Sequence, residues 1–297
     1  MSHMTRLGQM PVPGPQLREM LDAVQREFSA SAFAADHDVV IRSNAIHAME
    51  AQTINRVLPR GGTLLDIGTG YGIMPELFHR LGARVISVDH PTTGGTRALQ
   101  RLMELGIEGH YAEVGGAAPL PVPDNSVDVV FAGNVIEHLP HSPRPFLAAI
   151  RRLLKPGGRL VVDTINAVDL RRRIKFLIGV SNWPPIEQLY PLEFHHEHHK
   201  EYTLAELGTA VTLAGFEMEE AVAFEAFFRQ PLRGSPLRVL RRSARLMTGT
   251  QRRSLFADRF QPFNPAEYLR LACLGAVGLF PNMRSDILVV GRKPHAH

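Results

Sequence analysis

The chain has 297 residues, of which 44% are apolar, so it can bury a sizeable core, and this excludes fibrous and disordered proteins. A single cysteine, Cys273, excludes an internal disulfide. The sequence contains no run of about 18 uncharged apolar residues, so we expect no helix that spans a membrane. The net charge of +4 is too small to indicate a nucleic-acid-binding protein. We expect a protein of the cytoplasm, where thiols stay reduced.

The N-terminal part predicts two amphipathic helices, over 16–28 and 44–58. The second helix is expected to end before Pro59, because proline disfavours a helical conformation in the residue that precedes it. We interpret residues 1–40 as a helical extension that forms a lid over the rest of the chain.

From Thr63 to Thr164, short aliphatic runs alternate with helical patterns, as in repeated βα units. Each run is almost entirely apolar, so both faces of the sheet should be covered by helices. The pattern predicts an α/β fold with a doubly wound, mostly parallel sheet. The predicted strands are 63–67, 83–89, 109–114, 127–133 and 159–164.

Towards the C-terminus the pattern changes. Thr203, followed three residues later by Glu206, is a capping box that opens a helix ending near Gly215. Two further strands, over 216–224 and 285–292, would complete a seven-stranded sheet as an antiparallel pair. The expected domains are a core of 41–225 plus 284–293, interrupted by a basic helical insert at 226–283.

A glycine-rich loop follows the first predicted strand. Gly68, Gly70 and Gly72 allow positive φ and let backbone N–H groups approach a ligand, although a tight structural turn also needs glycine. Asp89 ends the next strand, about twenty residues on, where a carboxylate can accept both hydroxyls of a ribose. Asp66 precedes the loop and favours an ammonium or sulfonium over a pyrophosphate.

These residues occur with further motifs in a fixed order: PDNSVDVV (123–130), NVIEHL (134–139), LLKPGGRLVV (153–162) and EYTLAEL (201–207). In this combination the chain resembles class I S-adenosylmethionine-dependent methyltransferases, which implies their Rossmann-like fold and their cofactor. The resemblance implies that Asp66, Gly68, Gly70 and Gly72 hold the methionine part, Asp89 the ribose, Asn134 the amino group and Glu113 the adenine. Gly115 to Ala118 interrupts the usual adenine segment, however.

Methylation of a hydroxyl requires a base, and histidine has a suitable pKa. The resemblance favours His198, because related chains place a histidine three residues before the glutamate of the EYT motif, and His138 is the other candidate. His195 and His199 are candidate substrate contacts from the same histidine-rich run. A packed loop or a metal site are alternatives for this run, and a packing role is the alternative for His138, but we expect no metal.

Asn166 belongs to a segment resembling the TPN-x-LRxR stretch of sugar, polysaccharide and secondary-metabolite O-methyltransferases, with Ile165 in place of the proline. It is a candidate contact for a substrate hydroxyl or a cap for the following helix.

The positive charge is concentrated in one region. Nine arginines lie between Arg229 and Arg259 against one acid, Asp258, and 236–247 predicts an amphipathic helix. Such a helix packs on the domain, contacts an anionic membrane or binds an anionic or lipid-linked substrate. An RNA partner is disfavoured, because NVIE lacks the N/D-P-P-Y/F motif frequent in RNA methyltransferases.

The sequence therefore predicts an S-adenosylmethionine-dependent enzyme that methylates an oxygen of a small molecule, sugar or natural product. The alternatives are N- or C-methylation, RNA methylation, and a non-catalytic adenosyl-binding protein.

Overall fold

The computed structural model describes residues 14–30, 44–91, 96–113, 119–140, 142–182, 198–226, 272–273 and 275–295. Within them, one seven-stranded sheet has the order β3-β2-β1-β4-β5-β7-β6. Its strands are β1 (Thr63–Ile67), β2 (Arg84–Asp89), β3 (Glu108–Tyr111), β4 (Val127–Gly133), β5 (Leu154–Ile165), β6 (Glu217–Phe224) and β7 (Asp286–Arg292). All neighbours are parallel except β7, which runs antiparallel to both β5 and β6.

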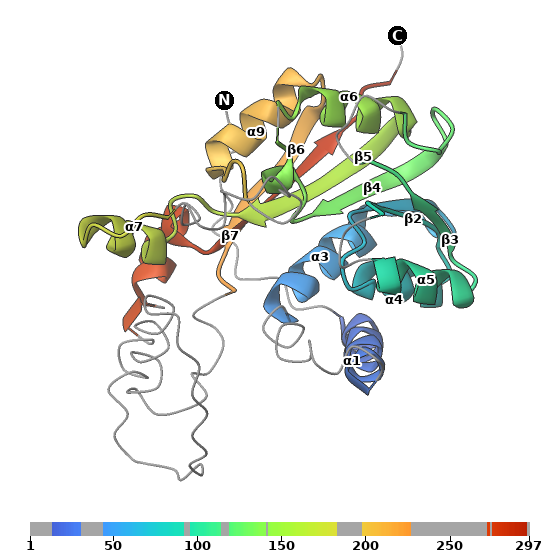
Figure 1. Ribbon diagram of the computed structural model, residues 1–297, viewed down its shortest axis with the longest axis horizontal. Helices are drawn as coiled ribbons and strands as arrows, with labels where there is room; N and C mark the ends of the chain where they lie inside the picture. The colour runs from blue at the N-terminus through green and yellow to red at the C-terminus, as the bar shows by residue number, and fades with distance from the viewer. Residues whose placement is uncertain are drawn as a thin grey trace.

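Helices cover both faces of the sheet, with α1, α3, α4 and α5 below it and α6 and α9 above it (Figure 1). This layering confirms the predicted doubly wound fold. The helices are α1 (Pro15–Ala30), α3 (Asn44–Val57), α4 (Ile73–Arg80), α5 (Thr96–Glu104), α6 (Arg144–Leu153), α7 (Leu170–Leu177) and α9 (Leu204–Leu213), with short 3-10 turns η2 (Ile136–His138) and η3 (Pro281–Met283).

The core consists of two apolar layers, one on each face of the sheet. Successive strand residues point to opposite faces, so Leu64 belongs to the layer with α1, α3, α4 and α5, and Leu65 to the layer with α6 and α9. All five residues of β1 are buried. The apolar strand runs in the sequence are therefore explained by burial on both faces.

The predicted ends of β1 and β4 and the antiparallel pair of β6 and β7 are confirmed. The capping box is confirmed too, since the Thr203 side chain accepts from the Glu206 N–H and the Glu206 carboxylate accepts from the Thr203 N–H. β5 instead begins at Leu154, five residues earlier than predicted. Gly157, at φ 78°, lies inside this longer strand. The strand continues there because the Gly157 N–H donates to the carbonyl of Lys293, the residue after β7.

The N-terminal helix α1 belongs to the core. Leu17, Leu21 and Val24 are buried, and the ring of Phe28 packs edge-to-face on Tyr71, with 5.4 Å between the centroids. Because Tyr71 lies in the glycine loop, α1 borders that loop. Its role as a lid stays a prediction.

The arginine-rich segment from Arg229 to Arg259 lies outside the described residues, as does most of the predicted insert. Among the helices that are described, none has the length and apolarity needed to cross a membrane.

The strand order reverses at β1, which lies between β2 and β4. In open parallel sheets, ligands bind beyond the carboxyl ends of the strands at such a reversal. At this edge the glycine loop follows β1, Asp89 is the last residue of β2, and Asn134 follows β4. The fold therefore brings together residues that are far apart in the sequence.

Candidate active site

The glycine loop connects β1 to α4 in a conformation that requires glycine. Gly68, Gly70 and Gly72 have φ of 77°, 54° and 76°. A Cβ on Gly68 would lie 2.3 Å from the Val135 side chain, which no real contact permits. The Gly70 N–H donates to Asp89 Oδ2 at 3.2 Å, so the acid also holds the loop.

Buried carboxyl groups converge beside this loop. Asp66 is 2% exposed, and its Oδ2 has no hydrogen-bond partner among the described residues. Burial raises the pKa of Asp66 to about 7, and the negative charge of Asp89 adds to the rise. An acid this isolated from water is poised to accept a cation.

A second buried acid, Asp163 of β5, lies close by. Asn134, at φ 51°, donates through Nδ2 to Asp163 Oδ2 at 3.2 Å, and Asp163 Oδ1 accepts from no N–H or hydroxyl of the described residues. A Cβ on Gly133 would lie 3.1 Å from both Asp163 Oδ1 and Glu50 Oε1. Burial and mutual repulsion raise the pKa of both carboxyls, that of Glu50 to about 8. At least one of them therefore carries a proton at neutral pH.

A second cluster follows β4, in the turn η2. The rings of His138 and His198 meet edge-to-face, with 4.8 Å between their centroids. Glu137 is 1% exposed, and neither of its carboxylate oxygens has a hydrogen-bond partner among the described residues. Burial raises the pKa of Glu137 to about 7. The cluster therefore combines two imidazole rings with a buried carboxyl group whose pKa is about 7.

The comparisons with known proteins agree with this geometry. Residues 65–162 match the family described as "Methyltransferase domain". Two curated relatives are named "Ubiquinone biosynthesis O-methyltransferase". The one from Cupriavidus pinatubonensis is 33% identical, and the match covers 54% of this chain and 62% of the relative. The one from Pseudomonas paraeruginosa is 29% identical, and the match covers 60% of this chain and 75% of the relative. Residues 65–162 of the chain are therefore similar to methyltransferase domains, and we refer to this part as the methyltransferase domain.

Solved structures support the fold of this methyltransferase domain. A putative sarcosine dimethylglycine methyltransferase from Galdieria sulphuraria superposes with a TM-score of 0.51 at 16% identity, covering 86% of this chain and 87% of that one. Phosphoethanolamine N-methyltransferase 2 from Haemonchus contortus, solved with S-adenosyl-L-methionine, gives 0.52 at 17% identity, covering 91% and 60%. The chain spans less than two thirds of the length of the first curated relatives.

The edge of the methyltransferase domain fits S-adenosylmethionine. Asp66 and Asp163 each have a buried oxygen that accepts from no N–H or hydroxyl of the described residues, and these carboxyl groups suit the ammonium group. Asp89 is 5% exposed and ends β2, as a ribose-binding acid should. Glu113 is exposed two residues beyond β3, and its contact with adenine stays a prediction.

The pH dependence of cofactor affinity tests this fit. An ammonium group is bound best by ionised carboxylates, whereas protonation of Asp66 weakens binding. Since the pKa of Asp66 is about 7, we expect the Kd for S-adenosylmethionine to fall roughly tenfold from pH 5.5 to pH 7, where the amino group of the ligand stays protonated. Calorimetry measures this change. Equal Kd values at both pH values, or an unchanged profile in Asp66→Asn, would contradict the role of Asp66.

Asn166 corrects an expectation. Its side chain is 1% exposed, donates through Nδ2 to the carbonyls of Asn282 and Arg284, and accepts from the Val168 N–H. These bonds occupy the amide inside the protein, so we assign Asn166 to fixing the end of β5 and not to substrate. Helix α7 is capped by Asp169 instead.

The other predicted histidines are placed as follows. His195 lies outside the described residues. His199 is half-buried, and its backbone N–H donates to the Glu137 carbonyl at 2.7 Å. This bond joins the segment that carries His198 to η2, which explains why His198 and His138 meet although sixty residues separate them.

Asp66 and Asp89 were predicted, but three buried acids of the two clusters were not predicted as site residues. Glu137 was read only as a possible packing partner of His138, and Glu50 and Asp163 were not considered. The spacing of Glu201 three residues after His198 was a usable signal for a paired base. Glu50 had no such signal, because it reaches the site from α3.

Proposed function

We propose that the chain transfers the methyl group of S-adenosylmethionine to the oxygen of a hydroxyl group on a small molecule. The proposal depends mainly on one contact: the ring of His198 packs against the ring of His138. The buried Glu137 lies next to them, three residues after Asn134 in the chain. This cluster offers the base that O-methylation requires. The names of the curated relatives, at about 30% identity, favour the same chemistry.

The first task of the site is alignment. Bound S-adenosylmethionine supplies a methyl carbon on a positively charged sulfur, which is already an electrophile. Asp66 and Asp163 would hold the ammonium group, and Asp89 the ribose, so that the methyl group points in one direction. Alignment of this kind lowers the barrier by reducing the loss of entropy in the transition state.

The second task is removal of a proton. His198 accepts the proton of the acceptor hydroxyl as the oxygen attacks, and the nearby carboxylate of Glu137 stabilises the resulting imidazolium. The pKa of a phenolic hydroxyl, about 10, is far closer to that of such a base than the pKa of an aliphatic alcohol is. We therefore expect hydroxylated aromatic compounds to be the best acceptors.

Matched acceptors test the proposal. Purified protein is incubated with S-adenosylmethionine and pairs of compounds that differ only in a hydroxyl or an amino group, and products are identified by mass and by the position of the methyl group. We expect methyl ethers from phenols and little product from the paired anilines. N-methylated products, or transfer to none of the hydroxyl compounds, would refute the proposal.

The same assay separates a base from a metal site. The ligand atoms of Glu137, His138 and His198 lie within 4.8 Å of one another, close enough to bind one metal ion. The proposed base predicts full activity after treatment with EDTA. Loss of activity that added Mg²⁺ or Zn²⁺ restores would reassign the cluster to metal binding.

Other classes of acceptor molecule are also considered. Glycans and anionic or lipid-linked molecules enter the acceptor panel because of the arginine-rich segment from Arg229 to Arg259. We place the reaction in the cytoplasm, in keeping with a chain that has a single cysteine.

A further inference from the structure

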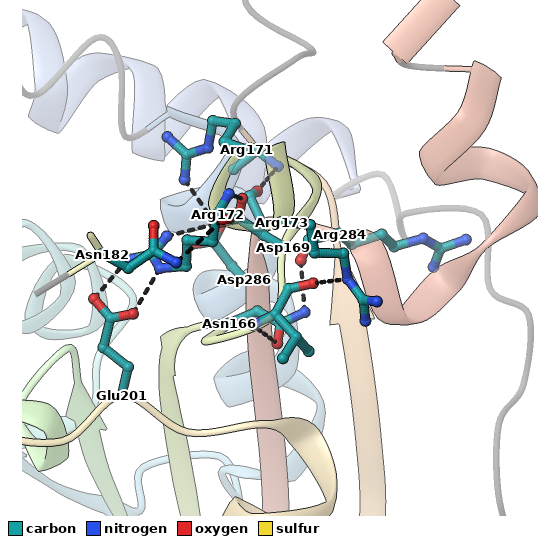
Figure 2. A network of polar contacts seen from close by, with 12 residues as sticks. Asn166, Asp169, Arg171, Arg172, Arg173, Asn182, Glu201, Arg284 and Asp286 are labelled. Atoms are coloured by element: carbon teal, nitrogen blue, oxygen red, sulfur yellow. Dashed lines mark hydrogen bonds and ion pairs between the residues drawn. The ribbon is translucent and has the colours of Figure 1, made fainter. Parts of the chain in front are cut away.

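A series of alternating charges links His198 to the first turn of α7. His198 Nδ1 lies 3.3 Å from Glu201 Oε1. Arg172 donates to Glu201 through two atoms, Nε to Oε2 at 2.6 Å and Nη2 to Oε1 at 2.7 Å. Arg172 also pairs with Asp169, the residue that caps α7 (Figure 2). The Glu201 carboxylate is therefore held in one orientation by a bidentate ion pair.

The charge of Glu201 determines which nitrogen of His198 carries a proton. Burial raises the pKa of Glu201, but hydrogen bonds from His198 and Arg172 outweigh it and lower the pKa to about 2. An ionised carboxylate only accepts hydrogen bonds. The contact at 3.3 Å is therefore favourable only when His198 Nδ1 carries a hydrogen, and in a neutral ring this leaves the lone pair on Nε2.

The backbone around this pair is fixed on both sides. The His199 N–H donates to the Glu137 carbonyl at 2.7 Å, which joins the segment to η2. Tyr202 forms a parallel bridge with Asn166, and the Ala167 N–H donates to the Tyr202 carbonyl at 2.9 Å, which joins it to the end of β5. Glu201 lies between these anchors, so the backbone bonds to η2 and to the end of β5 hold it close to His198.

We propose that Glu201 is a positioning residue for His198: held by Arg172, it fixes the ring with Nδ1 protonated and directs Nε2 to the acceptor hydroxyl. This inference rests on the proposed function. In the step itself, the O–H proton moves to Nε2 and leaves an imidazolium, the oxygen lone pair forms the bond to the methyl carbon, and the C–S bond breaks with its electron pair on sulfur. The carboxylate stabilises the imidazolium without accepting its proton.

Several charged or titratable groups surround His198, and their effects on its pKa have opposite signs. Glu201 raises the pKa most, Glu137 of η2 raises it as well, and burial and Arg172 of α7 lower it. Among the described residues, the ring of His138 is a further titratable group in contact with it. Removal of the Glu201 charge should therefore lower the pKa of His198. Since the neutral ring is the base, the acidic limb of the rate profile should move to lower pH.

The test compares Glu201→Gln, which keeps the size of the side chain and loses its charge, with the wild-type protein. We expect kcat at the pH optimum to fall by about tenfold or more, the Kd for S-adenosylmethionine to stay unchanged, and the acidic limb to shift to lower pH. Arg172→Lys, which keeps the charge but loses the bidentate geometry, should give a smaller loss of kcat. Glu219→Gln is the matched control, because Glu219 forms a similar two-atom pair with Arg159 on the sheet, and it should retain wild-type kcat.

A second readout is independent of methyl transfer. Long-range ¹H–¹⁵N NMR, with His198→Gln used to assign the signal, reports the tautomer and pKa of His198 in the full chain. We expect the Nδ1–H tautomer in the wild-type protein and a lower pKa in Glu201→Gln. The same tautomer and pKa in both proteins would overturn the inference, as would an unmoved acidic limb in an active enzyme. An inactive wild-type protein with the expected NMR signals would refute only the proposed function.

Discussion

Substitution of His198 by glutamine is expected to lower kcat by roughly 100- to 1000-fold at pH 7, because general-base catalysis contributes about that much to proton transfer. Glutamine keeps a polar side chain but has no group that accepts a proton near neutral pH. The Kd for S-adenosylmethionine should stay the same, since the cofactor acids Asp66 and Asp89 are untouched. Steady-state kinetics and calorimetry measure the two quantities.

Two further variants show whether the loss of activity is specific to His198. His110→Gln is the matched control, because His110 also lies next to a glutamate, Glu108, at 3.1 Å, but on β3, and it should keep wild-type kcat. His138→Gln tests the other candidate base and should lose less activity than His198→Gln. Full activity of His198→Gln between pH 6 and pH 8 would remove His198 from the proposed role. A larger loss in His138→Gln would transfer the role to His138.

Substitution of Gly68 by alanine is expected to weaken binding of S-adenosylmethionine by about 100-fold or more. The new Cβ would lie 2.3 Å from the Val135 side chain, and φ of 77° disfavours any residue with a Cβ. The loop must move away from the end of β4, which displaces Asp66 and the loop backbone that we assign to the cofactor, and disturbs the bond from the Gly70 N–H to Asp89. Calorimetry gives the Kd, and circular dichroism checks that the protein is folded.

Gly82→Ala separates the two causes. Gly82 has φ of 86°, yet a Cβ there would have no atom within 4 Å. This variant should lose about 1 kcal/mol of folding stability because of backbone strain, and keep the wild-type Kd. If Gly68→Ala binds the cofactor as well as Gly82→Ala does, the glycine loop is a structural turn and not part of the binding site.

The sequence predicted best those features that depend on neighbouring residues. β1 and β4 were predicted from end to end because their residues are apolar on both faces, and the Thr203–Glu206 capping box requires only a spacing of three. The start of β5 at Leu154 was missed, because proline and two glycines usually end a strand. Pairing of Gly157 with Lys293, far along the chain, overrides that local signal.

The same distinction explains the candidate site. Gly68 and Asp89 were predicted because a turn and a strand end position them. The meeting of Glu50 with Asp163 depends on how α3 packs on the sheet, which no local spacing reports. Asn166 was a candidate for a substrate contact or a helix cap because its segment resembles that of sugar and secondary-metabolite O-methyltransferases, but its amide donates to carbonyl groups more than a hundred residues away.

A crystal structure of the full chain with S-adenosylhomocysteine tests the account most directly. We predict the ribose hydroxyls on the Asp89 carboxylate, the amino group against Asp66, and the sulfur facing the cluster of Glu137, His138 and His198. This arrangement would place the departing methyl group where His198 can deprotonate an acceptor. A sulfur that faces away from His198, or a ligand bound away from the carboxyl ends of β1 and β2, would contradict the account.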